Sequence, residues 1–445
     1  MTSSLNIIIY SAFIIAIFCL SSPKIAYKGN FIAIFAMLFA IIINFISLPP
    51  TIQLKTLIPL LLGALTGTTL SLKIKLKDLP QIIALLNGFG GLSSLLIGIS
   101  SFLLQTFHPF FLIFIILLGS ITFFGSLASF IKLKTTLSLK HPQFYKTTSV
   151  ILLLFTLLFS YFTPNLSLPN LLFITFLSSL FGFLFILPIG GADMPIIISL
   201  LNSLSGWTTV LIGLFTKNTL LIITGTLIGA SGTILSYIML KYMNKKLLTV
   251  LFSSPTKQPT TSSLSNIHQT TPKDVAFLLE NATNIIIVPG FGLASSNAEH
   301  LLKTLDDILT YQYHTNIKYA IHPVAGRMPG HLNIILAEAE INDSSIFELK
   351  DINKDFKTTD IALVIGANDI TNPIAKTDPT SPIYQMPILE VENASKIIFI
   401  KRSLSPGYSG IDNPLFYEDK TLMLLGDAKE ILKQIIKELE SSTTF

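Results

Sequence analysis

Residues 284–296 read NIIIVPGFGLASS, a run of branched apolar residues that ends in a proline and a Gly-x-Gly turn. An apolar β-rich run bounded in this way predicts a buried strand, and a helical pattern continues from the turn to about Thr310. Such a turn between strand and helix lets backbone N–H groups approach a pyrophosphate without a Cβ in the way. The third glycine position holds Ser295, so an ordinary glycine turn remains an alternative.

Five more β-rich runs follow and alternate with helical stretches. This alternation predicts a Rossmann-like α/β domain with a doubly wound parallel sheet over residues 272–445, closed by a helix at about 427–441. The further strands are expected at 317–321, 345–349, 361–366, 397–401 and 421–425.

The rest of the chain has a different composition. The whole sequence is 50% hydrophobic and 12% charged, which excludes an ordinary soluble protein. Residues 1–255 hold 14 lysines and two acids (14 − 2 = +12), and residues 256–445 hold 16 bases and 23 acids (16 − 23 = −7), in agreement with the net charge of +5. Because the excess lysines lie between apolar runs, they indicate contact with membrane lipid and not with nucleic acid.

Nine apolar runs are long enough, at 1.5 Å per residue, to cross most or all of a bilayer. We therefore expect a multi-pass α-helical membrane bundle of about nine spans in a transmembrane domain at 1–250, followed by a Ser/Thr/Pro-rich linker at 251–271. The spans are expected near 5–22, 31–48, 57–72, 81–105, 110–131, 148–163, 171–188, 194–214 and 219–242.

Lysine placement predicts the orientation of the bundle. The loops after the odd-numbered spans, with the segment that leads into the linker, carry 13 lysines, and the opposite loops carry only Lys55 and Lys217. By the positive-inside rule the C-terminal domain is expected in the cytoplasm. Without a transit peptide, and as a separate chain, the protein is expected in a bacterial inner (plasma) membrane.

Two features favour NADP(H) over NAD(H) as the bound nucleotide. The second strand ends at His322 with no acid to bind the ribose hydroxyls that NAD presents. The chain has only two arginines, Arg327 and Arg402. Because a guanidinium suits bidentate phosphate contacts, the sequence Lys401-Arg402-Ser403 is a candidate clamp for a 2′-phosphate, with surface ion pairs as the alternative.

The segments after the fourth and fifth strands are also candidates. Gly366–Asp369 ends the fourth strand, at the edge where open parallel sheets bind ligands. The Pro-rich stretch 370–387 is long for a compact domain and predicts a lid, with a plain surface loop as the alternative.

Several long motifs, in order, resemble the β subunit of the proton-translocating NAD(P) transhydrogenase. The resemblance covers nearly the whole chain. In the membrane half it rests on GGADMP (190–195), LNSLSGW (201–207) and IGASGTILSYIM (228–239). In the C-terminal half it rests on VPGFGLA (288–294), HPVAGRMPGHLN (322–333), LVIGANDITNP (363–373), SPIYQMPILEV (381–391), KRSLSPGYSGIDNPLF (401–416) and LLGDAK (424–429).

The resemblance implies which residues contact NADP(H), with Lys401 and Arg402 on the 2′-phosphate. The family usually has tyrosine where this chain has Phe291, so a hydroxyl contact there is lost. The implied contacts are Gly290, Phe291, Gly292, Leu293, Ala294, Ser295, Val324, Ala325, Gly326, Arg327, Met328, Pro329, Gly366, Ala367, Asn368, Asp369, Ile370, Gln385, Met386, Lys401, Arg402, Ser403, Leu404, Ser405, Pro406, Gly407, Tyr408, Asp427 and Ala428.

The resemblance also implies an enzyme that works with a partner. NAD(H) would bind on an α subunit that brings further membrane helices, in a dimer of αβ units. Direct hydride transfer from NADH to NADP⁺ would be driven by protons moving inward through the bundle. Asp369 would couple nucleotide redox state to the membrane. No metal is implied, and the sequence, with one cysteine, offers no Cys/His cluster of metal-ligand spacing.

The proton path has few candidate residues. Asp193 is the only acid near a membrane segment apart from Asp78. Some family members carry an intramembrane histidine where this chain has Asn87, and Asn218 at the start of the last span is a second polar candidate. For both asparagines, simple hydrogen bonding between helices is the alternative.

Two other functions remain open from the residues alone. One is an ion channel or transporter regulated by a Rossmann-type nucleotide-sensing domain, although the chain has no TVGYG-like filter and no midplane charge pair. The other is a binding subunit of a different membrane oxidoreductase that passes electrons to a flavin on a partner.

Overall fold

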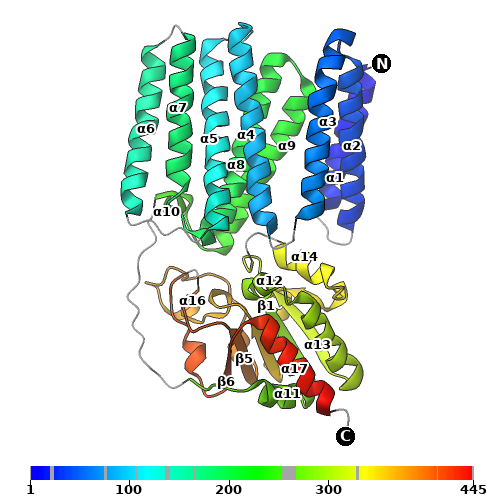
Figure 1. The fold of residues 1–445 in the computed structure, drawn as a ribbon. Helices are drawn as coiled ribbons and strands as arrows, with labels where there is room; N and C mark the ends of the chain where they lie inside the picture. Colours follow the sequence, from blue (N-terminus) through cyan, green and yellow to red (C-terminus); the bar gives the residue numbers. More distant parts are fainter. Residues whose placement is uncertain are drawn as a thin grey trace.

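A computed structural model describes residues 2–20, 25–74, 78–106, 108–135, 141–163, 166–252, 267–326, 330–407 and 409–442. The N-terminal half is a bundle of long helices, and the C-terminal half is an α/β domain at one end of that bundle (Figure 1). The predicted fold class is confirmed.

The bundle contains eight helices that are long and apolar enough to cross a membrane among the described residues. In the first helix, α1, the apolar stretch Leu5–Cys19 is shorter than the others. The chain is therefore a multi-pass membrane protein. The eight helices are α2 (Ala26–Ile46), α3 (Pro50–Lys73), α4 (Leu79–Leu103), α5 (Pro109–Lys134), α6 (Pro142–Phe162), α7 (Leu168–Ile186), α8 (Met194–Thr216) and α9 (Thr219–Tyr242). They are preceded by α1 (Thr2–Leu20) and followed by the short α10 (Leu247–Phe252).

Small residues let α8 and α9 pack backbone against backbone. A Cβ added to Gly206 on α8 would lie 2.3 Å from the backbone nitrogen of Gly229 on α9. Across the same seam the Ser203 hydroxyl donates to the Gly229 carbonyl at 2.8 Å, and the Ser199 hydroxyl donates to the Gly232 carbonyl at 2.9 Å. Close approach and interhelical hydrogen bonds stabilise this pair where apolar burial gives little in lipid.

Helix α3 differs from its neighbours. None of its residues is buried among the described parts of the chain. A Cβ added to Gly63 or Gly67 would meet nothing within 4 Å. The helix therefore adds nothing to the core of this bundle.

The α/β domain is built on one parallel six-stranded sheet in the order β3-β2-β1-β4-β5-β6. The chain order reverses between β1 and β4, and the crevice beyond the carboxyl ends of these strands is the usual ligand position in such sheets. The strands are β1 (Asn284–Pro289), β2 (Asn316–Ile321), β3 (Ile346–Glu348), β4 (Ile361–Ile365), β5 (Lys396–Lys401) and β6 (Thr421–Leu425).

Alternate side chains of each strand feed two hydrophobic cores. One face packs Ile285, Ile287 and Leu363 beneath α11 (Pro272–Glu280), α13 (Glu299–Gln312) and α17 (Ala428–Ser442). The other face packs Ile286 and Val364 beneath α14 (His331–Glu338), α15 (Leu349–Ile352) and the turn η8 (Pro414–Tyr417). Both faces of the sheet are covered, as parallel sheets require.

The helical stretch after β1 is not continuous. It forms α12 (Phe291–Ser296) and then α13, separated at Asn297, whose φ of +49° is left-handed. Asparagine adopts that conformation more easily than most residues and so ends a helix. The predicted single stretch to Thr310 was wrong on this point.

The chain enters the domain along β6. Residues 253–266 of the predicted linker lie outside the described residues, and α10 occupies its first two positions. The His268 carbonyl accepts from the Met423 amide at 2.8 Å, and the Thr270 amide donates to the Met423 carbonyl at 3.2 Å. Thr271 then caps α11 in a capping box with Asp274.

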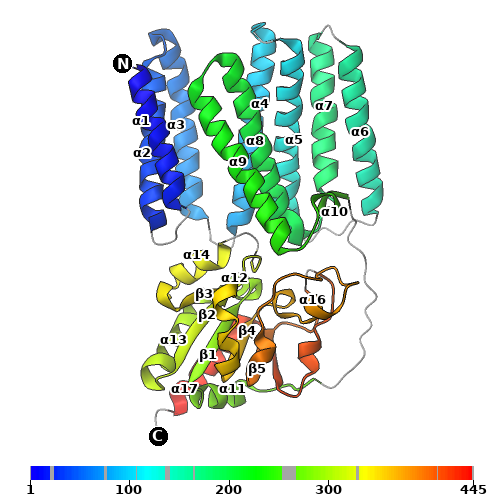
Figure 2. The same ribbon diagram turned by 180° about the vertical axis from the view of Figure 1, so that it is seen from behind.

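The domain lies at one end of the bundle (Figure 2), and two of its loops contact the bundle. Val324, in the loop after β2, packs against the apolar cluster at the start of α8, against one hydrophobic core of the sheet, and against the small cluster around Met386. Asn244 lies just after α9, and its side-chain Nδ2 donates to the Tyr384 carbonyl. Both loops therefore contact the bundle directly.

Candidate nucleotide-binding site

The turns after β1 and β4 interlock through glycines. The amides of Gly290 and Gly292 donate to the carbonyls of Ile365 and Gly366, both at 2.9 Å. A Cβ on Gly292 would lie 2.4 Å from the Gly366 Cα, and a Cβ on Gly366, whose φ is +66°, would lie 2.3 Å from the Gly292 Cα. These glycines are thus needed for backbone packing, and the structure uses two of the amides that the sequence assigned to a pyrophosphate.

Asp369 fastens the loop after β5 to the turn after β4. Its carboxylate accepts from the Ser409 amide at 2.8 Å and from the Ser409 hydroxyl at 2.7 Å. A Cβ on Gly407 would lie 2.5 Å from one of its oxygens. Asp369 therefore sets the position of the loop that follows Lys401 and Arg402.

Asn368 presents a buried donor in the same turn. Its side-chain oxygen accepts a hydrogen bond from the side-chain Nδ2 of Asn413 at 3.2 Å, and the residue is only 8% exposed. Among the described protein atoms its Nδ2 has no hydrogen-bond partner. Because an unmatched buried donor costs about 1–3 kcal/mol, a ligand oxygen at this point would be stabilising.

Lys401, at the end of β5, is a cation held in a partly apolar setting. Its Nζ lies 4.4 Å from the centroid of the Phe416 ring and donates to the Ser405 carbonyl at 3.1 Å. Burial lowers the pKa of Lys401 to about 8, and the carboxylates of Asp369 and Asp412 act in the opposite direction. An anionic ligand beside Lys401 would stabilise its charged form.

Arg402 and two serines complete a row of donors. The guanidinium binds Asp427 through Nε at 3.0 Å and Nη2 at 2.8 Å, and its side chain is 62% exposed. The hydroxyls of Ser403 and Ser405 lie 3.0 Å apart. Two cations and two hydroxyls within five residues match the donors that a phosphate needs. The surface ion pair that the sequence left as an alternative is also present.

The loop after β2 contacts the stretch before β5. His322 is 1% exposed; its Nδ1 accepts from the Val324 amide at 3.2 Å, and its Nε2 donates to the Pro387 carbonyl at 2.6 Å. Burial lowers the pKa of His322 to about 4, so the ring is neutral. Met386 and Val324 share one apolar cluster, so the predicted contacts at 324–325 and 385–386 lie together.

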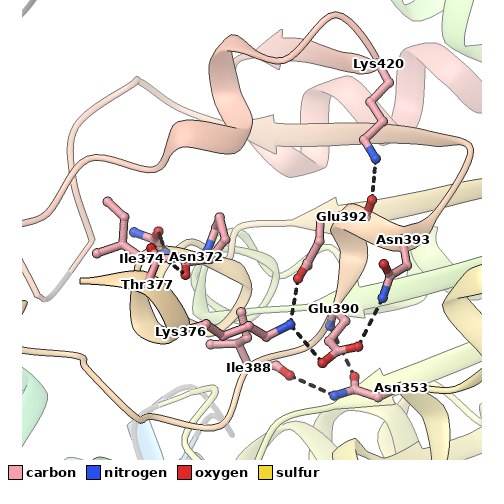
Figure 3. A network of polar contacts seen from close by, with 11 residues as sticks. Asn353, Asn372, Ile374, Lys376, Thr377, Ile388, Glu390, Glu392, Asn393 and Lys420 are labelled. Atoms are coloured by element: carbon pink, nitrogen blue, oxygen red, sulfur yellow. Dashed lines mark hydrogen bonds and ion pairs between the residues drawn. The ribbon is translucent and has the colours of Figure 1, made fainter. Parts of the chain in front are cut away.

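The stretch predicted as a lid is folded and anchored. It includes the short helix α16 (Ile374–Thr377), and Lys376 Nζ lies 2.8 Å from both Glu390 and Glu392 (Figure 3). The side-chain Nδ2 of Asn353 donates to the Ile388 carbonyl at 2.9 Å. A cavity of about 460 Å³ lies beside this network and reaches Gln385 and Met386.

Not every predicted contact can be placed. Arg327, Met328, Pro329 and Tyr408 lie outside the described residues. Leu293 is fully buried in the core, so its side chain does not face the crevice. Ser295 donates its hydroxyl to the Gly292 carbonyl at 3.1 Å and so closes the first turn of α12.

The membrane candidates lie at three levels of the bundle. Asp193 pairs with Lys245 at 2.8 Å at the end next to the domain. Asn87 donates to the Ile198 carbonyl at 3.2 Å between α4 and α8. Asn218 accepts from the amides of Leu220 and Leu221 and caps α9 at the far end.

Sequence reasoning missed a group of hydroxyls near Asn87. Thr122 and Ser126 on α5 are fully buried, and their oxygens and that of Ser205 on α8 have no partner among the described protein atoms. All three residues border glycines of α4: an added Cβ would lie 3.2 Å from Ser126 at Gly88, 3.0 Å from Ser205 at Gly90 and 2.8 Å from Thr122 at Gly91. Serine and threonine are common in membrane helices, so only the packing distinguishes these.

Comparison with known proteins identifies the family. A family model described as NAD(P) transhydrogenase beta subunit matches residues 2–438. The NAD(P) transhydrogenase subunit beta of Rhodospirillum rubrum is 40% identical over 466 residues, which cover 99% of this chain and 100% of the relative. The protein from a designated strain of the same species gives the same values.

This chain belongs to the NAD(P) transhydrogenase beta-subunit family. It is thus one subunit of a transhydrogenase that uses nicotinamide nucleotides and has a partner subunit. Family membership disfavours both other functions considered, the regulated channel and the unrelated oxidoreductase subunit. The resemblance stated from the motifs is confirmed.

Proposed function

We propose that the C-terminal domain binds NADP(H) across the carboxyl ends of β1, β4 and β5. The observation that carries this proposal is the row of donors after β5, where Lys401 and Arg402 stand beside two serine hydroxyls. These residues would hold the 2′-phosphate that distinguishes NADP from NAD. Asn368 would donate its unmatched amide to the same ligand.

Hydride transfer needs a second nucleotide. NAD(H) would be held by an α subunit, and the two subunits would work as a dimer of αβ units. When bound, the two nicotinamides supply the hydride chemistry. This chain would position its nucleotide and exclude water, with the segment 370–387 acting as a lid over the crevice.

Proton movement through the bundle would drive the reaction. Asn218 at the far end, Asn87 within the bundle and Asp193 next to the domain are spaced along α8, which starts beside Asp193 and ends beside Asn218. Asn87 lies eight residues into α4, about 12 Å along the helix at 1.5 Å per residue. The unmatched hydroxyls of Thr122, Ser126 and Ser205 favour ordered water at that level.

Asp369 would connect this path to the nucleotide. Its two hydrogen bonds to Ser409 fix the loop that carries the donors. The loops at Val324 and Tyr384 provide contact with the bundle. The lysine bias supports a cytoplasmic domain on a bacterial inner membrane.

The function is tested by expressing this chain with its genomic neighbour in membrane vesicles. NADPH should then reduce an acetylpyridine analogue of NAD, and the internal pH of the vesicles should change with it. A well-inserted preparation that binds NADPH but catalyses no such reaction would refute the proposal.

The nucleotide assignment is tested by Arg402→Ala in the same complex. NADPH binding should weaken by at least tenfold, about 1.4 kcal/mol, and NADH binding should change much less. Lys396→Ala is the matched control, because Lys396 is an exposed lysine at the opposite end of β5. Equal losses for NADPH and NADH would contradict the 2′-phosphate assignment.

A further inference from the structure

A polar cavity lies at the end of the bundle away from the nucleotide domain. It measures about 280 Å³ and is formed by the start of α1, the end of α2 and the turn between α8 and α9. All but one of its residues are polar. They are Asn6, Tyr10, Asn44, Thr216, Lys217, Asn218, Thr219 and Leu220.

Some of these polar groups already have partners. The side-chain Nδ2 of Asn44 donates to the Ala40 carbonyl at 2.8 Å, and the Thr216 hydroxyl donates to the Ile212 carbonyl at 2.9 Å. Asn218 caps α9. Within the described chain, the Lys217 ammonium and the Tyr10 hydroxyl form neither an ion pair nor a hydrogen bond. The Lys217 ammonium, which can only donate, is therefore the charged group of the cavity that has no partner in the described chain.

The cavity has one cation and no acid to balance it. Residues 1–255 contain two acids, Asp78 and Asp193. Both lie at the other end of the bundle, where Asp78 precedes α4 and Asp193 pairs with Lys245. An anion from outside the chain is thus the matching partner for Lys217.

The position of the cavity indicates which anion is present there. Tyrosine and lysine at the ends of membrane helices lie at the level of the lipid headgroups. The phosphate of a phospholipid is the abundant anion at that level, and it accepts hydrogen bonds from ammonium and hydroxyl groups.

We propose that this cavity binds a phosphate group, presented by a phospholipid headgroup. Lys217 supplies the charge, and Tyr10 and Asn6 supply further donors. The bound lipid would join the hairpin of α1 and α2 to the turn between α8 and α9. This site lies at the opposite end of the bundle from the nucleotide domain, and it shares Asn218 with the proposed proton path.

The test uses the delipidated complex of this chain with its partner, in detergent, and measures the thermal unfolding midpoint. Added phosphatidylglycerol should raise the midpoint of the native protein, because a ligand that binds the folded state stabilises it. Lys217→Gln should lose at least half of that rise. Lys55→Gln should keep it, since Lys55 is an exposed lysine at the same end that does not line the cavity.

Two further additions identify the group that is recognised. Diacylglycerol with the same acyl chains lacks the phosphate and should give no Lys217-dependent rise. A Lys217-dependent rise with phosphatidylglycerol and none with inorganic phosphate supports the lipid; an equal rise with inorganic phosphate in the absence of lipid would overturn the assignment to a lipid headgroup. Equal stabilisation of native protein and Lys217→Gln by phosphatidylglycerol would overturn the proposal.

Discussion

Arg402 and Asp427 form a two-pronged ion pair, with both Nε and Nη2 on one carboxylate oxygen. The pair joins the residue after β5 to the residue before α17, at the carboxyl ends of the strands. It therefore positions the guanidinium before any nucleotide arrives.

Asp427→Asn should lower the free energy of unfolding by less than about 1 kcal/mol. The side chains of Arg402 and Asp427 are 62% and 36% exposed, and exposed ion pairs contribute little to stability. Thermal unfolding of the native and variant proteins measures the effect. A loss of several kcal/mol would show that the pair is structural, and the binding test of Arg402→Ala would then need reinterpretation.

Gly366→Ala should destabilise the domain by at least about 3 kcal/mol, because left-handed strain adds to a clash with the Gly292 backbone. Gly330→Ala separates the two effects. Gly330 has a φ of +74° and open space around its missing Cβ, so this variant should lose only about 1–2 kcal/mol. Equal shifts of the unfolding midpoint in the two variants would contradict the interlock.

NADPH affinity should fall as the pH rises above about 8. Lys401 in the nucleotide-free protein loses its proton there, because burial has lowered its pKa to about 8. If the ammonium holds the phosphate, the dissociation constant rises by up to about tenfold per pH unit. Titrations between pH 7 and 9.5 measure this. Lys401→Arg should flatten the profile, and an unchanged profile would exclude Lys401 from the phosphate site.

Acid should destabilise the protein through His322. Its pKa is about 4 in the folded protein, below the ordinary histidine value of 6.5, so the unfolded chain takes up the proton first. The stabilising contribution is complete above pH 6.5 and is lost as the pH falls towards 4, by about 1.4 kcal/mol per pH unit. The difference between native protein and His322→Asn, followed by unfolding from pH 7.5 to 4.5, isolates it. Parallel curves would show that His322 does not titrate in this way.

Local sequence patterns were sufficient to locate the main elements. All six strands begin and end within a residue or two of the predicted runs. A short run of branched apolar residues between turn residues strongly favours a buried strand over other structures. The break at Asn297 was missed because one residue with positive φ does not disturb a helical pattern.

The site could be predicted only in part. The residues after the strands were identified because parallel strands bring their carboxyl ends to one edge. Long-range contacts are not encoded in spacing: the Gly292–Gly366 packing, the Ser409 hydrogen bonds to Asp369 and the contact of His322 with Pro387 each join segments that lie dozens of residues apart.

The isolation of α3 has a consequence for sequence variation. Since none of its residues is buried within the described chain, exchange of one apolar residue for another along α3 should not disturb this subunit's own fold. If every position of α3 is mutated and the variants are screened for function in cells, the positions that do not tolerate substitution should therefore be those that contact another subunit. At Gly63 and Gly67, where an added Cβ would meet nothing of this chain within 4 Å, substitutions that impair function would indicate a neighbouring subunit.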